Sequence, residues 1–382
     1  MSERPLPQQF RHFADSTERD GASTYTAICR GVADDAGVLA LLGEAPIAQR
    51  RPNILLAAVH FLLLGGVQHD LATHYDTVRS VPGEQSPLTR SVVDDFIAFC
   101  AEHRDELVHL VSTRSTQTNE VGRCTALLPA FSSVGARYPG QPLALLDLGA
   151  SAGLNLLFDH YGYTYVQRQV GTGVTAGEPT SNVTLHCVVR GDPRTLPLGP
   201  LSIAARVGVD LSPLDPTSAD DARWLLACLW PDNLPRFTRL QEALSIARTA
   251  VDPPTLHRGD IIEDLAAVAA TIDPAIPLIV FHSWVAAYLT AARQAALVQA
   301  VRALSATRPV HYLYAEQTTE TPGLPTPPPP EASPLGDLRT AVVHLDLAGG
   351  GNDVPPVRLA DMHPHGRWLR WWADPQAASA AP

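Results

Sequence analysis

The sequence has few of the features that mark nucleic-acid-binding or disulfide-bonded proteins. Its five cysteines are far apart, odd in number and form no Cys-x-x-Cys pair, which argues against a zinc site or a disulfide framework. The 28 basic residues are scattered singly and the formal net charge is −11, so the clustered positive charge that a nucleic-acid backbone requires is absent. We found no internal repeat. These absences argue against nucleic acid as a partner.

Long apolar segments are also missing. The longest run, residues 54–64, is interrupted by His60 and is too short to cross a bilayer. Residues 1–13 lack the basic-then-apolar layout of a signal peptide. We therefore expect a cytoplasmic protein that makes no membrane contact. A hydrophobic content of 45% over 382 residues supplies an ample core for one large domain or two ordinary ones.

The N-terminal third predicts helices. Apolar residues recur three and four positions apart between residues 8 and 115, and prolines stand between these patterns. Residues 53–64 are apolar almost all round and predict the central helix of a bundle. On this helix, His60 fits a hydrogen-bonded core histidine better than a ligand. We expect an all-helical N-terminal domain or lid over residues 1–140 and an α/β domain over residues 141–382.

A glycine-rich turn follows the first expected strand of the α/β domain. Residues 143–148 form an apolar run with one carboxylate, Asp147, which is typical of a parallel strand buried on both faces. Gly149 and Gly153 frame a turn of small residues, and residues 154–158 continue with helical spacing. Such a turn lets the backbone approach a ligand, and the following helix would offer it free N–H groups. The segment predicts a ligand-binding loop.

Further strands are expected at residues 183–189, 203–215, 256–265, 276–289 and 309–318, with two final strands joined by a glycine-rich hairpin near the C-terminus. Residues 322–334 predict an exposed proline-rich loop. Ligands of open parallel sheets lie beyond the C-terminal strand ends. Among the residues at these ends, Asp210 could bind the hydroxyls of a ribose or could be the N-cap of the next helix. Asp260 is expected beside an adenine ring. His282 and Ser283 could belong to a ligand site or to a structural hydrogen-bond cluster. His363 and His365 lack a third ligand, so no metal site is expected.

A polar segment precedes the glycine loop, over residues 112–123. If a helix starts near Thr118, Asn119 and Arg123 lie one turn apart on the same face. One interpretation is an N-cap followed by a surface ion pair between Glu120 and Arg123. The other is a polar cluster aimed into a cleft, with Gln117 included, because amides, a carboxylate and a guanidinium suit a zwitterionic ligand.

The order of these motifs carries a resemblance. The pattern Asp-x-Gly-x-Ser-x-Gly at residues 147–153, followed by GVDLSP, RGD and VFHSW, resembles class I S-adenosylmethionine (SAM) methyltransferases. More specifically, RPNILLAAVHFLLL, TRSTQTNEVGRC, LLDLGASAGLNLLFD and HPHGRWLRW resemble the bacterial family called domain of unknown function 2332. The resemblance implies a Rossmann-like α/β fold with a seven-stranded mixed sheet whose last strand is antiparallel. Ser151 departs from the methyltransferase pattern, where a middle glycine is usual.

The resemblance also implies a function and a set of site residues. The resemblance implies a methyltransferase-like transferase that acts on a small polar metabolite in natural-product biosynthesis. Its cofactor would be SAM, although members of such a fold can work without it. Glu120, His282 and Arg123 are the expected catalytic residues, and Gln117, Asn119 and Ser283 the substrate ligands. The implied cofactor-binding residues are Asp147, Gly149, Ser151, Gly153, Asn155, Asp210 and Asp260.

Two alternatives remain open from the sequence. One is a SAM-independent cyclase or lyase that closes a small nitrogen ring, of the aziridine type, with loss of an anionic leaving group. That chemistry would use Glu120 and Arg123 and would suit a small protein partner or a homodimer. The other is a non-catalytic binding or assembly protein that keeps only the fold.

Overall fold

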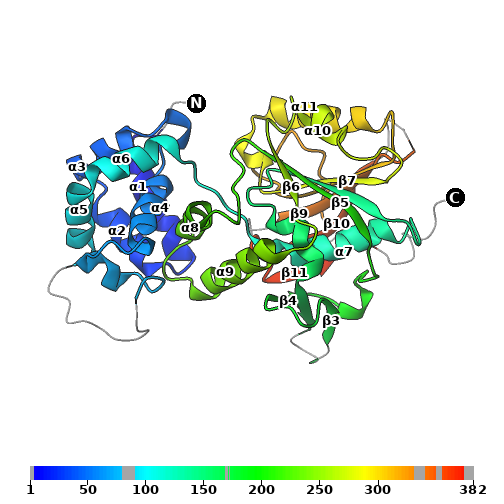
Figure 1. Ribbon diagram of the computed structural model, residues 1–382, viewed down its shortest axis with the longest axis horizontal. Coiled ribbons are helices and arrows are strands. Elements are labelled where there is room, and N and C mark those ends of the chain that lie inside the picture. The colour runs from blue at the N-terminus through cyan, green and yellow to red at the C-terminus, as the bar shows by residue number, and fades with distance from the viewer. Residues whose placement is uncertain are drawn as a thin grey trace. The chain divides into compact units, whose positions relative to one another are not determined.

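The structure, a computed structural model, describes residues 4–79, 91–167, 171, 173–330, 340–349 and 355–373 (Figure 1). The chain divides into two units. Unit 1 comprises Met1–Thr118 and Asp215–Leu244, and unit 2 comprises Asn119–Leu214 and Ser245–Pro382. This differs from the single boundary near residue 140 that the sequence suggests. Helix α7 (Cys124–Gly135) packs on strands of unit 2, whereas helix α8 (Ala219–Ala227) packs on helix α4 of unit 1.

Unit 1 is helical, as the sequence predicts. Helix α4 (Pro52–Leu64) starts with a proline at its first position and ends at Gly65, and ten of its thirteen residues are buried. It contacts α1, α6 and α8, which confirms its central place in the bundle. The other helices are α1 (Leu6–Arg19), α2 (Ser23–Gly31), α3 (Ala36–Gly43), α5 (Val92–Glu102), α6 (Arg104–Thr113) and the first part of α9 (Leu234–Thr249). None of the helices in the described ranges is long and apolar enough to cross a membrane.

His60 is a core histidine with both ring nitrogens occupied, as expected. Nδ1 lies 3.1 Å from the carbonyl oxygen of Ala227 and 3.2 Å from that of Leu229, and Nε2 lies 2.7 Å from Thr77 Oγ1. Two carbonyl acceptors at Nδ1 fix the proton there, so the ring is neutral and accepts at Nε2. Burial lowers the pKa of His60 from 6.5 to about 4.

Acid is expected to destabilise the protein partly through His60. The unfolded histidine binds a proton below pH 6.5 while the buried one does not until about pH 4, so stability is lost as the pH falls through this window. The loss is about 3 kcal/mol at the lower end. Urea unfolding of wild type and His60→Gln at pH 7 and pH 4.5 measures it. The variant should be less stable at pH 7 but should lose less on acidification, whereas the exposed His12→Gln should match the wild-type slope.

Unit 2 is built on one mixed sheet. The sheet has eleven strands in the order β3-β2-β4-β11-β10-β9-β8-β7-β1-β5-β6. The strands that the sequence anticipates are β1 (Leu143–Leu148), β4 (Thr184–Val189), β5 (Ile203–Asp210), β6 (Thr255–Arg258), β7 (Leu278–Ser283), β8 (Val310–Gln317), β9 (Thr340–Asp346) and β10 (Val357–Met362). The additional ones are β2 (Gly162–Val166), β3 (Gly173–Gly177) and β11 (Trp368–Trp371). The prediction of seven strands is therefore wrong, although the mixed α/β class is confirmed.

The extra strands have identifiable causes. β2 pairs parallel with β4 and antiparallel with β3, and these pairings stabilise a segment whose glycines argue for a loop. At the C-terminus, Gly366 adopts a left-handed φ of 72° and turns the chain between β10 and β11. One expected final strand is thus two. Residues 321–330 of the proline-rich stretch form no helix or strand, and residues 331–334 lie outside the described residues.

Five strands, β6, β5, β1, β7 and β8, run parallel in that order. β1 is buried along its whole length, as its apolar run predicts. One face packs with α10 (Leu265–Ala269) and α11 (Ala291–Leu304) around residues such as Leu146, Val280 and Leu297. On α7, Phe131 contacts Phe281 of β7 and Phe158, with ring centroids 5.0 and 4.9 Å apart. The chain leaves β1 for β5 on one side and returns to β7 on the other, so β1 marks a topological switch point.

Candidate functional site

The loop after β1 is the tight turn that the sequence predicts. Gly149 has a φ of 79°, Ser151 of 54° and Gly153 of 72°, so three of five consecutive residues adopt left-handed conformations. A Cβ atom at Gly149 would lie 2.5 Å from Val285 Cγ2, on the segment that follows β7. Glycine is therefore required here for both backbone conformation and space. Ser151 carries left-handed strain, a feature that is common at ligand-binding sites.

The segment after the loop differs from the expected helix. It is a 3-10 helix, η4 (Leu154–His160), interrupted by non-helical dihedral angles at Leu157. The N–H of Leu154 donates to Asn119 Oδ1 at 3.0 Å, and Asn155 Oδ1 accepts from the Cys124 thiol at 3.5 Å. The expectation of a regular helix is wrong, and the N–H of Leu154 is not free for a ligand because it is bound to Asn119.

Asp210 ends β5 and fixes the glycine loop. Its Oδ2 accepts from the N–H of Ser151 at 2.9 Å, and its Oδ1 accepts from the N–H of Ser212 at 2.8 Å. It is not the N-cap of the next helix, because Ser218 caps α8. Because β5 runs parallel beside β1, the strand register places Asp210 at the same end of the strands as the glycine loop. Asp210 is therefore part of the loop architecture.

Two buried polar atoms beside the loop have no hydrogen-bond partner among the described residues. They are Asp147 Oδ2 and Ser151 Oγ, in side chains that are about 3% and 2% exposed. Burial and the nearby Asp210 raise the pKa of the Asp147 carboxyl well above its usual range, and Arg123 partly opposes that rise. Unsatisfied buried polar atoms are costly, so these two atoms make the loop the candidate for a ligand-binding site.

Arg123 is almost fully buried in unit 2. Its Nε donates to the carbonyl oxygen of Pro364 at 3.1 Å, and its Nη1 donates to the carbonyl oxygen of Ser283 at 3.0 Å and to Ser283 Oγ at 3.3 Å. The guanidinium also lies over the ring of Trp284, 5.5 Å from its centroid. It therefore joins the start of α7, the end of β7 and the turn before β11.

Glu120 is buried as well and caps the short helix η3 (Val121–Arg123). Its Oε1 accepts from the N–H of Gly122 at 2.9 Å, and its Oε2 lies 3.3 Å from His365 Nδ1. The expectation of a surface ion pair between Glu120 and Arg123 is wrong, because both side chains are about 5% exposed or less. Helix α7 starts at Cys124, not near Thr118. The polar cluster exists, but its charged groups are directed into unit 2.

His282 belongs to a buried network. Its Nδ1 lies 2.7 Å from Glu316 Oε1, its Nε2 lies 2.7 Å from the Tyr312 hydroxyl, and its ring stacks on Tyr314. Glu316 Oε1 also accepts from the N–H groups of Val285 and Ala286, at 2.8 and 3.1 Å. The geometry favours the structural interpretation of His282 over a catalytic base. Glu316 was not anticipated, although a carboxylate near the end of an apolar strand is a signal that could have identified it.

Two other predicted residues make local contacts of their own. Asp260 lies beside the end of β5, because the N–H of the preceding Gly259 donates to the carbonyl oxygen of Asp210 at 3.0 Å. Asp260 accepts from the N–H groups of Ile262 and Glu263 and pairs with Arg293 at 2.6 Å, so it organises the turn after β6. Gln117 belongs to unit 1, where its N–H donates to Cys228 Sγ at 3.5 Å. The structure thus brings together Asn119, Glu120, Arg123, Asp147, Ser151, Asn155, Asp210 and Ser283 around the glycine loop in unit 2.

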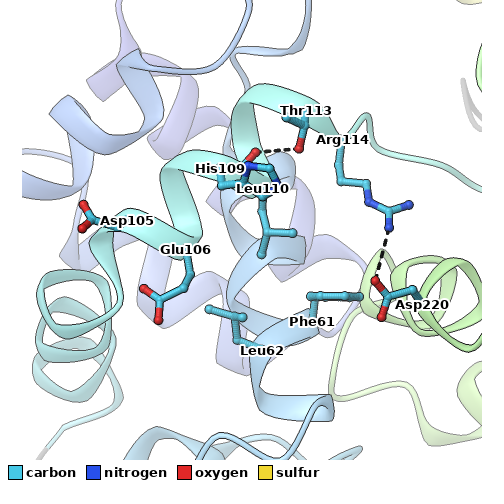
Figure 2. A pocket seen from close by; sticks show the side chains of 9 residues that line it. All are labelled: Phe61, Leu62, Asp105, Glu106, His109, Leu110, Thr113, Arg114 and Asp220. Atoms are coloured by element: carbon cyan, nitrogen blue, oxygen red, sulfur yellow. Dashed lines mark hydrogen bonds and ion pairs between the residues drawn. The ribbon is translucent and has the colours of Figure 1, made fainter.

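Unit 1 contains a cavity that no sequence pattern indicated. It has a volume of about 480 Å³ and lies between α4 and α6, as Figure 2 shows. Its apolar lining comes from Phe61, Leu62 and Leu110, and its polar lining from Asp105, Glu106, His109, Thr113, Arg114 and Asp220. Arg114 pairs with Asp220 at 3.8 Å and with Asp221 at 2.7 Å. None of the predicted site residues lines it.

Substitution of Gly149 by alanine is expected to distort the loop and to lower stability by about 2–4 kcal/mol, the sum of left-handed strain and overpacking against Val285. Gly140→Ala is the matched control, because Gly140 has a φ of 75° and open space around it. It should cost only the strain, about 1–2 kcal/mol. Urea unfolding measures both. Val285→Ala in the Gly149→Ala background should recover part of the loss, and equal costs at the two glycines would contradict the contact.

Comparison with known proteins identifies a family match. The family model described as "Uncharacterized protein conserved in bacteria (DUF2332)" matches residues 7–371, nearly the whole chain. No curated protein matches the chain. The match therefore agrees with the sequence resemblance at the level of the family, and the site geometry must carry any statement about activity.

Proposed function

Because the chain belongs to the bacterial family of domain of unknown function 2332, we propose a function from the site itself. We propose that unit 2 binds SAM at the glycine loop and transfers its methyl group to a small polar metabolite. The observation that carries the proposal is the pair of buried polar atoms without partners, Asp147 Oδ2 and Ser151 Oγ, beside a strained loop at the switch point of the parallel strands.

Charge supports a cationic ligand. Asp147 and Asp210 lie close enough for Asp210 to raise the pKa of Asp147, and Arg123 offsets this only in part. A ligand with a positive centre near this pair would relieve the repulsion and satisfy the free carboxylate oxygen. SAM carries a sulfonium and an ammonium group, and its ribose hydroxyls suit the carboxylate at the end of β5. The donor and acceptor set of the loop therefore fits SAM.

The chain's own contribution to the reaction would be mainly positioning. When bound, SAM supplies an electrophilic methyl group, whose transfer requires the nucleophile to be held in line at near-attack distance. Asp147 and Asp210 would orient the cationic end and the ribose. Arg123 holds Ser283 and the turn at Pro364 in place and thereby shapes the neighbouring surface. Glu120 and His282 are engaged in internal hydrogen bonds, so we assign neither as a proton acceptor.

The two alternatives depend on other features. Ring closure without SAM would use Gln117, Asn119, Glu120 and Arg123 as one working cluster. Arg123 donates to buried backbone carbonyls and Glu120 caps a helix, so both charged groups are engaged in internal contacts. For these reasons we favour SAM-dependent transfer over ring closure. A non-catalytic binding protein could also use the free oxygen of Asp147 for its ligand, so assays of methyl transfer separate that alternative from the proposal.

Calorimetry tests the proposal. We expect SAM and its demethylated product to bind with one site per chain, and adenosine to bind more weakly because it lacks the cationic end. Absence of heat with both SAM and its product at millimolar concentration would rule the proposal out. Binding of the product by an Asp147→Asn variant should weaken, while Asp192→Asn, a substitution at an exposed turn of the same unit, should leave it unchanged.

A further inference from the structure

A second cluster of polar side chains lies at the end of the parallel strands that is opposite the glycine loop. His311 lies near the start of β8, and its register partner on β9 is Asp346. His344 stands two residues before Asp346 on β9, so all three side chains project from the same face of the β8–β9 pair. Because β8 runs parallel to β1, the start of β8 is remote from the C-terminal strand ends where the proposed SAM site lies.

The three side chains converge. His311 Nδ1 lies 3.1 Å from His344 Nε2 and 3.4 Å from Asp346 Oδ1, and the three atoms lie within 4.8 Å of one another. In a tetrahedral zinc site with bonds of roughly 2.0–2.2 Å, two ligand atoms stand about 3.3–3.6 Å apart. The two distances from His311 Nδ1, 3.1 and 3.4 Å, are close to this separation. Two imidazoles and one carboxylate form a ligand set that zinc commonly uses.

An outer layer of contacts orients the ligands. His311 Nε2 lies 2.8 Å from the Tyr138 hydroxyl, so a metal at Nδ1 would leave the other nitrogen to donate to Tyr138. Arg137 binds Asp346 through Oδ2, which leaves Oδ1 directed toward His311. The N–H of Ala348 donates to Oδ1 at 3.0 Å, and that oxygen retains a second lone pair. Arg137 also places a positive charge nearby, which would weaken the attraction for a cation.

We propose that His311, His344 and Asp346 bind one divalent transition-metal ion, Zn²⁺ being the ion that the spacing fits, and that it links β8 to β9. Asp346 is about a quarter exposed, which leaves room for water as a fourth ligand. No sequence motif indicates this site, because His311 and His344 are 33 residues apart. The site shares no residue with the glycine loop, so it stands whether or not SAM binds.

Metal titration of the full chain tests this inference. After treatment with EDTA and dialysis, wild type should bind one Zn²⁺ per chain by calorimetry, and its melting temperature should rise with zinc concentration. His344→Gln and Asp346→Asn should each weaken binding about 100-fold or more, and Tyr138→Phe roughly 10-fold. Arg137→Gln should bind at least as tightly as wild type, because it removes a competing charge. The exposed His186→Gln is the matched control and should bind normally.

Cobalt gives a readout that does not depend on the variants. Wild type loaded with Co²⁺ should show the intense visible absorption of a tetrahedral site, displaced by one equivalent of Zn²⁺. Circular dichroism identifies any variant that fails to fold. If a variant fails, the visible spectrum of Co²⁺-loaded wild type still tests whether the metal site exists. The inference is overturned if wild type shows no saturable zinc binding, or if folded His344→Gln and Asp346→Asn bind zinc as wild type does. In those cases the cluster is a hydrogen-bonded contact between strands only.

Discussion

Replacement of Arg123 by methionine is expected to lower the free energy of unfolding by about 3–5 kcal/mol, among the largest effects of any single substitution in unit 2. The side chain would keep an unbranched apolar stem but lose its charge and its donors. The carbonyl oxygens of Pro364 and Ser283 would lose their partner, and Asp147 would lose the positive charge that moderates its pKa. Urea unfolding at pH 7, followed by tryptophan fluorescence, measures the change.

Arg194→Met is the control for this prediction. Arg194 pairs with Asp192 at 2.6 Å, but its side chain is 71% exposed, so its removal should leave the free energy of unfolding nearly unchanged. Equal effects at the two arginines would mean that Arg123 does not hold the three segments together. This result bears on the alternative of ring closure, because loss of activity in an Arg123 variant would then reflect loss of structure before loss of chemistry.

Substitution of Asp210 by asparagine is expected to weaken SAM binding about 100-fold, which corresponds to about 2.7 kcal/mol. Asparagine keeps one oxygen that can accept from the N–H of Ser212, but it removes the negative charge and cannot accept at both positions. The loop would then lose its bond at Ser151, and the ligand would lose the carboxylate at the end of β5. Calorimetric titration of the variant with SAM gives the affinity.

Asp273→Asn is the matched control for Asp210→Asn. Asp273 Oδ1 accepts from the N–H of Ala275 at 2.9 Å, which is the same local contact that Asp210 makes with Ser212. Asp273 precedes β7, however, and so lies at the opposite end of the parallel strands from the glycine loop. Its substitution should leave SAM affinity unchanged. If both variants bind SAM like wild type, Asp210 serves only the conformation of the loop.

The parts of the fold that the sequence predicts are those with strong apolar patterns. The run at residues 143–148 gives β1, and the uniformly apolar segment after Pro52 gives α4. β2, β3 and β11 were not predicted because their strand character comes from pairing with distant partners. β11, for example, pairs with β4, which precedes it by about 180 residues. Local propensity cannot reveal such pairings.

The candidate site follows the same rule. The glycine loop and Asp210 were recognised because each lies at the end of an apolar run. The internal engagement of Arg123 could not be predicted, since its partners Ser283 and Pro364 are 160 and 241 residues away along the chain. His282 was a candidate base on its position at a strand end, but Glu316 and Tyr312 occupy both of its ring nitrogens. The position of a residue at a strand end predicts that it lies near the candidate site. Its hydrogen bonds are needed to tell whether it is a structural residue or one that is available to a ligand.

The most direct test of the account is a crystal structure of the full chain grown with the demethylated product of SAM. The account predicts density for one molecule against residues 149–153, with its ribose hydroxyls bonded to Asp210 and its ammonium group within reach of Asp147 Oδ2. An empty loop that keeps the Ser151–Asp210 hydrogen bond, under conditions where the product is in large excess, would contradict it.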